Sequence, residues 1–155
     1  MKRIYIVALL FFFICAFALS QVPPDRNSLL NGEEGIQAKV AGELGYPSPK
    51  SVLDDAATLK LTDDQKKQLK IIQSELTNRA QQLGKQVVKI EQELHDALQA
   101  GLVNEKAVGD DAQQIGRLRG RLRGVFLAAH LQTKKLLNSS QLEIYKKTSV
   151  SEEKK

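Results

Sequence analysis

Apolar residues recur at helical spacing along two long stretches of the chain. In the first, from Thr62 to about Ala100, successive apolar positions lie three or four residues apart, which matches the helical period of about 3.6 residues. A second stretch with similar spacing runs from a cap at Asn104 to near Leu137. The pattern therefore predicts two long helices. Their apolar positions are Leu69, Ile72, Leu76, Ala80, Leu83, Val87, Ile90, Leu94 and Leu98, then Val108, Ile115, Leu118, Leu122, Val125, Ala129 and Leu136.

The link between the two predicted helices is short. Gly101 is a natural helix stop, and Asn104 is a good cap for the next helix. A link of this length forces the helices to run antiparallel. We therefore predict an all-α fold without a β-sheet: a long antiparallel helical hairpin with short flanking helices, in a domain that spans residues 48–148.

The segments beside the hairpin are less regular. Residues 21–47 are rich in glycine and proline, which predicts a flexible lead-in, and residues 149–155 predict a disordered tail. Short helices are expected at 36–43, from a Ser48–Pro49 start to about Thr58, and at 139–147.

Three apolar residues lie off the main apolar stripes. They are Ile71 and Val88 on the first long helix and Phe126 on the second. One hairpin cannot close a core around its stripes and bury these residues as well, so we expect a homodimer with two-fold symmetry.

The first twenty residues have the pattern of a secretory signal. Lys2 and Arg3 precede a 14-residue apolar run, and small residues before Gln21 suit cleavage after Ser20. We expect a periplasmic protein that is not an integral membrane protein once residues 1–20 are removed. An uncleaved membrane anchor is the alternative.

Composition narrows the function classes. Cleavage would remove the only cysteine and the only methionine, and would leave 21 Lys and Arg against 18 Asp and Glu, a net charge of +3. So weak a basic balance does not indicate a nucleic-acid binder. The chain has no nucleophile–base pair, no phosphate-binding loop and no HExxH motif, so we expect neither an enzyme nor a bound cofactor.

Two similar five-residue motifs precede predicted helices. They are Leu61-Thr62-Asp63-Asp64-Gln65 and Leu137-Asn138-Ser139-Ser140-Gln141. In each motif a Thr or Asn lies three residues before a Gln, which is the spacing of a capping box. The first is a full LTxxQ motif, and the second has Asn138 in place of Thr.

These motifs resemble those of the Spy/CpxP group of exported proteins, which carry two LTxxQ motifs. The resemblance covers roughly residues 44–145 and includes Gly45 to Lys50 and the stretch around His130. It implies an envelope stress protein, either a periplasmic chaperone or a heavy-metal sensor or resistance protein. It also implies that Leu61, Thr62, Gln65, Leu137, Asn138 and Gln141 shape helix starts and do not touch client proteins.

A glycine row and an arginine row share the second long helix. Gly116, Gly120 and Gly124, flanked by Ala112 and Ala128, are spaced by four and form one line of small residues. Close packing of this line near Gly84 is one interpretation, and a shallow open groove is the other. Arg117, Arg119, Arg121 and Arg123 are candidates for attracting acidic client segments, or form a solvated face with partners such as Glu91 and Glu93.

The two histidines are far apart along the predicted hairpin. His95 is expected near its turn and His130 near Glu75, so they cannot share a metal ion within one chain. A metal site built on His130 and Glu75 is the candidate if the protein senses metals. Otherwise His130 is a partly buried residue with hydrogen-bond partners.

From these observations we expect an exported, ATP-independent chaperone-like protein. Its expected partners are unfolded or misfolded envelope proteins and a second copy of itself, with a membrane sensor protein as a further candidate. The alternative is a periplasmic heavy-metal sensor or metal-resistance protein.

Overall fold

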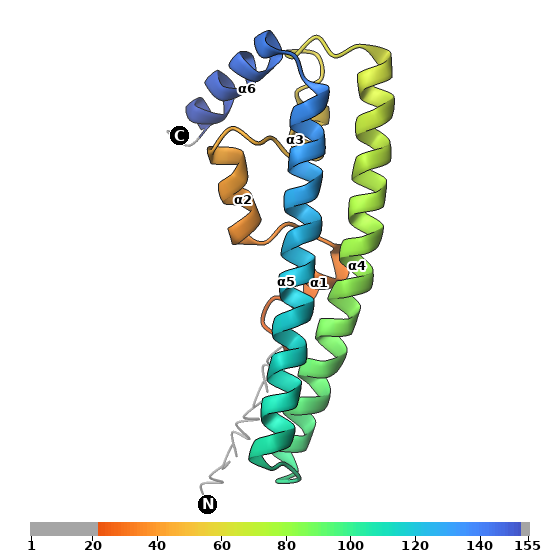
Figure 1. Ribbon diagram of the computed structural model, residues 1–155, viewed down its shortest axis with the longest axis vertical. Helices are drawn as coiled ribbons and strands as arrows, with labels where there is room; N and C mark the ends of the chain where they lie inside the picture. The colour runs from red at the N-terminus through yellow and green to blue at the C-terminus, as the bar shows by residue number, and fades with distance from the viewer. Residues whose placement is uncertain (1–21, 153–155) are drawn as a thin grey trace, which may run out of the picture.

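Two long antiparallel helices form the body of the protein (Figure 1). The computed structural model describes residues 22–152, and within them the chain is helical and has no β-strand. Helix α4 spans Asp63–Gln99 and α5 spans Glu105–Leu136. The predicted all-α hairpin is therefore confirmed. The expected signal peptide, residues 1–20, lies outside the described residues.

The ends of the long helices are set by their capping residues. The Thr62 side chain accepts from the Gln65 backbone N–H at the start of α4, and the Asn104 side chain accepts from Ala107 at the start of α5. After α4, Gly101 adopts a left-handed φ of 68°, which allows the two backbone hydrogen bonds of a Schellman turn. The hairpin turn thus follows from the glycine and the asparagine that predicted it.

Within residues 22–152, four shorter helices flank the hairpin. The predicted helix at 36–43 is confirmed, but α1 was not anticipated within the lead-in. The helix that starts after Ser48 ends at Asp54, earlier than the predicted Thr58. The four are α1 (Arg26–Asn31), α2 (Ile36–Glu43), α3 (Pro49–Asp54) and α6 (Ser139–Glu152).

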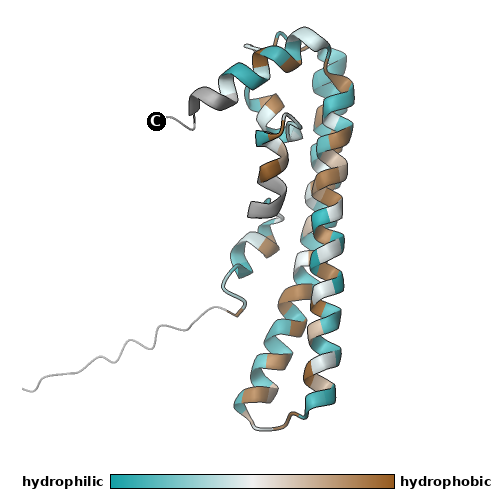
Figure 2. Ribbon diagram, turned by 60° about the vertical axis from the view of Figure 1, so that its left-hand side comes forward, coloured by the Kyte–Doolittle hydropathy of each residue, from teal (hydrophilic) through white to brown (hydrophobic). Residues whose placement is uncertain are grey.

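Helix α6 continues past its expected end at Lys147 into the expected tail. The sequence from Ser139 to Glu152 contains neither glycine nor proline, so nothing in it breaks the helix. The Thr148 hydroxyl also donates to the Tyr145 carbonyl at 2.9 Å, within the helix. Figure 2 shows α6 leaving the end of the hairpin and projecting above α2 and α3.

Buried apolar side chains in the described part of the chain form three clusters along the hairpin. Near the motifs, Val52, Leu69 and Tyr145 pack with Leu61 and Leu137. In the middle, Phe126 packs with Leu76, Ala80 and Ala129. Nearer the turn, Leu29 of α1 packs on α4 and α5 with Leu83, Val87, Val88, Ile90, Ile115 and Leu118.

These clusters correct the argument for a dimer. Val88 and Phe126, which were expected to need a second copy, are 5% and 4% exposed within a single chain. Residues of the lead-in supply the missing cover, since Leu29 shares the cluster that buries Val88. Only Ile71, at 51% exposed, remains open as expected. The homodimer stays a prediction. Of the three apolar residues that supported it, only Ile71 still has exposed surface that a second copy could bury.

No helix in the described part of the chain is both long enough and apolar enough to cross a lipid bilayer.

Candidate functional site

The fold brings the two sequence motifs together at one end of the hairpin. Leu61 and Leu137, the first residue of each motif, are buried in the same apolar cluster. Each motif forms a complete capping box, because Gln65 and Gln141 also accept, at 3.0 Å, from the backbone N–H groups of Thr62 and Asn138. The predicted capping role of both motifs is confirmed.

The two motifs also bind each other, a contact that the sequence patterns did not predict. The side-chain amides of Gln65 and Gln141 exchange hydrogen bonds at 3.0 and 3.1 Å. Each amide also donates to a backbone carbonyl just before the other motif. Gln65 donates to the Leu136 carbonyl at 2.7 Å, and Gln141 donates to the Leu59 carbonyl at 3.2 Å. The glutamine at the same position of both motifs was the one sequence feature that could have predicted this contact. These contacts make the motif residues part of the scaffold.

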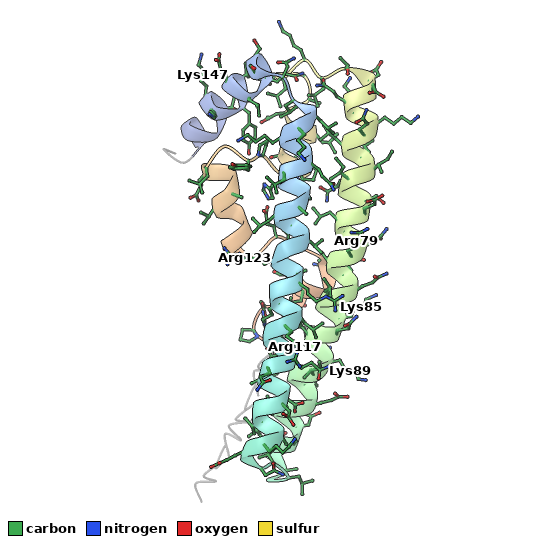
Figure 3. All side chains as sticks on the ribbon, viewed as in Figure 1. Arg79, Lys85, Lys89, Arg117, Arg123 and Lys147 are labelled. Carbon is green, nitrogen blue, oxygen red and sulfur yellow. The ribbon has the colours of Figure 1, made fainter. Side chains whose placement is uncertain are left out.

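The four arginines of α5 do not form one surface. At about 100° per residue, Arg117 and Arg121 lie on one side of the helix and Arg119 and Arg123 on nearly the opposite side. Figure 3 shows Arg123 on the side of α5 toward α2. The predicted group of four arginines is therefore split in two.

Arg119 is held by the lead-in and by α4. Its guanidinium donates to both carboxylate oxygens of Asp25, at 2.7 and 3.1 Å, and to Glu91 at 3.1 Å. The hydrogen bond from Arg119 lowers the pKa of Asp25 against a smaller opposing effect of burial. The hydrogen bond to Asp25 in turn raises the pKa of Arg119. Arg119 thus has the predicted partner Glu91, while Glu93 pairs with Lys89 instead.

Arg117, Arg121 and Arg123 are exposed and make no ion pair with the described residues. Arg79 on α4, which was not among the predicted site residues, is also exposed and makes no ion pair with the described residues. In Figure 3, Arg79 and Lys85 follow α4, while Arg117 lies on the neighbouring α5. Arg79 lies three residues after Leu76 and four before Leu83, both in the apolar stripe. This spacing could have predicted that Arg79 lies beside the contact between the two long helices.

No described residue packs closely on the glycine row, so the interpretation of close packing near Gly84 is wrong. A Cβ placed on Gly116, Gly120 or Gly124 would meet no atom of residues 22–152 within 4 Å. Gly84 does lie in close contact, but its neighbour is Leu29: a Cβ there would stand 2.0 Å from the Leu29 carbonyl oxygen. Helix α1, which was not predicted, packs against Gly84, where the close-packing interpretation had placed the glycine row of α5.

A groove of about 560 Å³ runs between α4 and α5 beside the glycine row. It combines cationic, polar and aliphatic side chains, and Gly124 and Ala128 leave it wide on the α5 side. We call it the open groove. Its charged and polar lining consists of Glu75, Arg79, Gln82, Gln86, Arg121 and Gln132.

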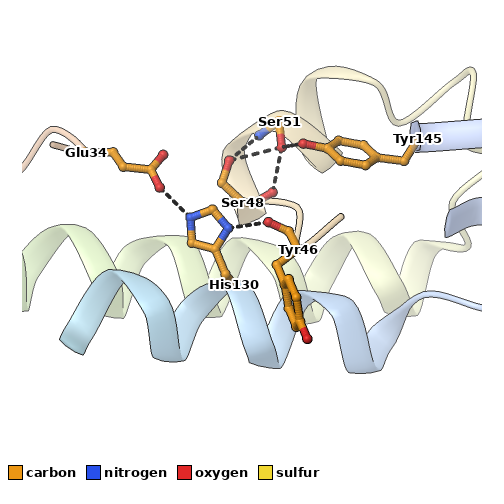
Figure 4. A network of polar contacts seen from close by, with 6 residues as sticks. All are labelled: Glu34, Tyr46, Ser48, Ser51, His130 and Tyr145. Carbon is orange, nitrogen blue, oxygen red and sulfur yellow. Dashed lines mark hydrogen bonds and ion pairs between the residues drawn. The ribbon is translucent and has the colours of Figure 1, made fainter. Parts of the chain in front are cut away.

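His130 is buried and tied to the lead-in (Figure 4). Its Nδ1 contacts the Tyr46 carbonyl oxygen at 2.5 Å, and its Nε2 contacts a carboxylate oxygen of Glu34. Both partners are acceptors, so both contacts are hydrogen bonds at the same time when each ring nitrogen carries a proton, which is the positively charged form of the ring. Burial lowers the His130 pKa, but the hydrogen bonds to Glu34 and Tyr46 and the Glu34 charge outweigh it, so that the pKa is raised overall.

The histidine has a different partner from the one predicted. Glu34, not Glu75, contacts His130, while Glu75 is exposed and lines the open groove. His95 is exposed near the hairpin turn. In the described part of the chain, no three His, Cys, Asp or Glu side chains are grouped so that they could hold a metal ion.

Comparison with known proteins gives no relative: no family model matches the chain, and neither a curated protein nor a solved structure is significantly similar to it.

Proposed function

We propose that this chain is an exported, ATP-independent chaperone-like protein that holds unfolded or misfolded proteins in the cell envelope. The observation that carries the proposal is the open groove, in which arginines stand beside aliphatic residues on a face of the hairpin where the described residues supply neither an ion pair to these arginines nor a cover over Gly124. The two LTxxQ-like motifs and the signal-like N-terminus agree with it.

The chemistry of the groove suits weak binding to many partners. An exposed ion pair contributes only about 0.2–1 kcal/mol, and burial of aliphatic surface contributes about 25 cal/mol per Å² without preferred direction. Neither interaction demands one defined partner shape. A surface that mixes the two can therefore hold different unfolded segments and release them without an energy source.

Suppression of aggregation tests this function. Several unrelated unfolded proteins would be diluted from denaturant with the mature protein, without nucleotide, and light scattering followed over time. We expect suppression at about equimolar protein, declining as salt rises, because exposed charges are screened over about 8 Å at physiological ionic strength. Unchanged aggregation of every client would contradict the function.

A homodimer is compatible with this function but is not required by it, because the groove is built within one chain. Sedimentation of the mature protein at micromolar concentration decides the oligomeric state.

A further inference from the structure

The charge on the open groove is unbalanced. Arg79 and Arg121 line it from opposite helices, and Glu75 is the only carboxylate in its lining. Arg117, one helical turn before Arg121, extends the cationic row along the same side of α5. None of these arginines has an acidic partner among the described residues, so a ligand that supplies carboxylates would find free donors.

The floor of the groove is aliphatic. Leu76 and Leu83 are almost fully buried there, and Ile72 and Val125 are half-buried. Gly124 and Ala128 form the small-residue side, and space for a larger side chain at Gly124 is free. Ile72 and Val125 therefore supply the aliphatic surface that side chains of a ligand can contact between the arginines.

We propose that the open groove selects acidic–aliphatic segments, in which Asp or Glu alternates with Leu, Ile or Val. Carboxylates of the segment pair with Arg79 and Arg121, and its aliphatic side chains lie over Gly124 and Ala128. A second copy of this chain is the poorer occupant, because its α5 would bring exposed arginines against these arginines. The proposal names the preferred client segment of the proposed chaperone and in that sense depends on that function.

Labelled peptides test the selectivity directly. An acidic–leucine peptide and the same peptide with lysine in place of glutamate would be titrated with the mature protein, and fluorescence anisotropy recorded. We expect the acidic peptide to bind at least about tenfold more tightly, since the lysine version places like charges beside the arginines.

Matched variants separate the groove from general charge. The double variant Arg79→Gln/Arg121→Gln should weaken binding of the acidic peptide about fivefold, since two exposed ion pairs are lost. Lys85→Gln/Arg123→Gln removes the same charge from exposed positions outside the groove lining and should change binding less than twofold. Gly124→Leu fills the groove without changing charge and should also weaken binding. Circular dichroism checks that each variant folds.

The outcomes distinguish this proposal from the function beneath it. If the protein suppresses aggregation but binds acidic and basic peptides equally, or if the control pair weakens binding as much as the groove pair, the selectivity is wrong and the chaperone function stands. If aggregation is unaffected but the acidic peptide binds with the expected variant pattern, the groove is a peptide site and the chaperone function is wrong.

Discussion

The two faces of the hairpin use the same residue types in opposite ways. On the covered face, against which residues 22–35 pack, Gly84 lies under Leu29 and Arg119 is paired with Asp25 and Glu91. On the open face, Gly124 has no neighbour over it and Arg121 has no partner among the described residues. A glycine or an arginine in a helix therefore indicates a role only once its neighbour is known.

The covered face should lose the most stability when Gly84 gains a side chain. In Gly84→Ala the new Cβ would clash with the Leu29 backbone, so α1 must move away and the buried Leu29 contacts are lost. We expect a loss of about 2–3 kcal/mol in the free energy of unfolding by urea. Unfolding at the wild-type midpoint would show that α1 does not pack there.

The second effect is the pH dependence that His130 gives to the covered face. Its folded-state pKa is raised, so its contribution is fully present below the unfolded pKa of about 6.5 and is lost as pH rises through the folded value. His130→Gln should therefore cost about 1.5 kcal/mol near pH 5.5 and progressively less at higher pH. A stability difference that does not change with pH would contradict the charged His130–Glu34 contact.

The open face should respond to an alanine with the opposite sign. Gly120→Ala meets no neighbour within 4 Å and improves helix propensity, so it should stabilise the protein by about 1 kcal/mol in the same urea experiment. A destabilised Gly120→Ala protein would mean that another molecule or copy covers this face.

The smallest expected effect compares two arginines. Arg119→Gln should cost about 0.5 kcal/mol, because the ion pairs it removes are partly exposed to solvent. Arg121→Gln should leave stability unchanged. Because the pKa of Asp25 is lowered, the Arg119 contribution is present above the unfolded Asp pKa and fades as pH falls through the folded value. Equal costs for both substitutions would remove the distinction between the faces.

The hairpin could be predicted from sequence because its information is local. Apolar spacing and the residues Thr62, Gly101, Asn104 and Asn138 set the helices and their ends, each through contacts within a few residues. Helix α1 could not be predicted in this way. Its six residues are too few to form a stable helix alone, so packing against α4 decides its structure.

The site was predicted less well than the hairpin, because contacts between residues far apart in sequence build much of it. Asp25 lies 94 residues from its partner Arg119, and Glu34 lies 96 residues from its partner His130, beyond the reach of any local pattern. By contrast, helical geometry alone could have predicted that the four arginines lie on two opposite sides of α5, since residues two apart on a helix point about 200° apart.

Site-specific photo-crosslinking tests most directly the proposal that the open face binds unfolded proteins. A crosslinking amino acid would replace Gln82 or Gln132 in the open groove and, as a control, Asn78 or Lys85, which are exposed but do not line it. With an unfolded client present, we predict strong crosslinks from the two groove positions and weak ones from the controls. Equal crosslinking from all four positions, or none from the groove, would contradict the account.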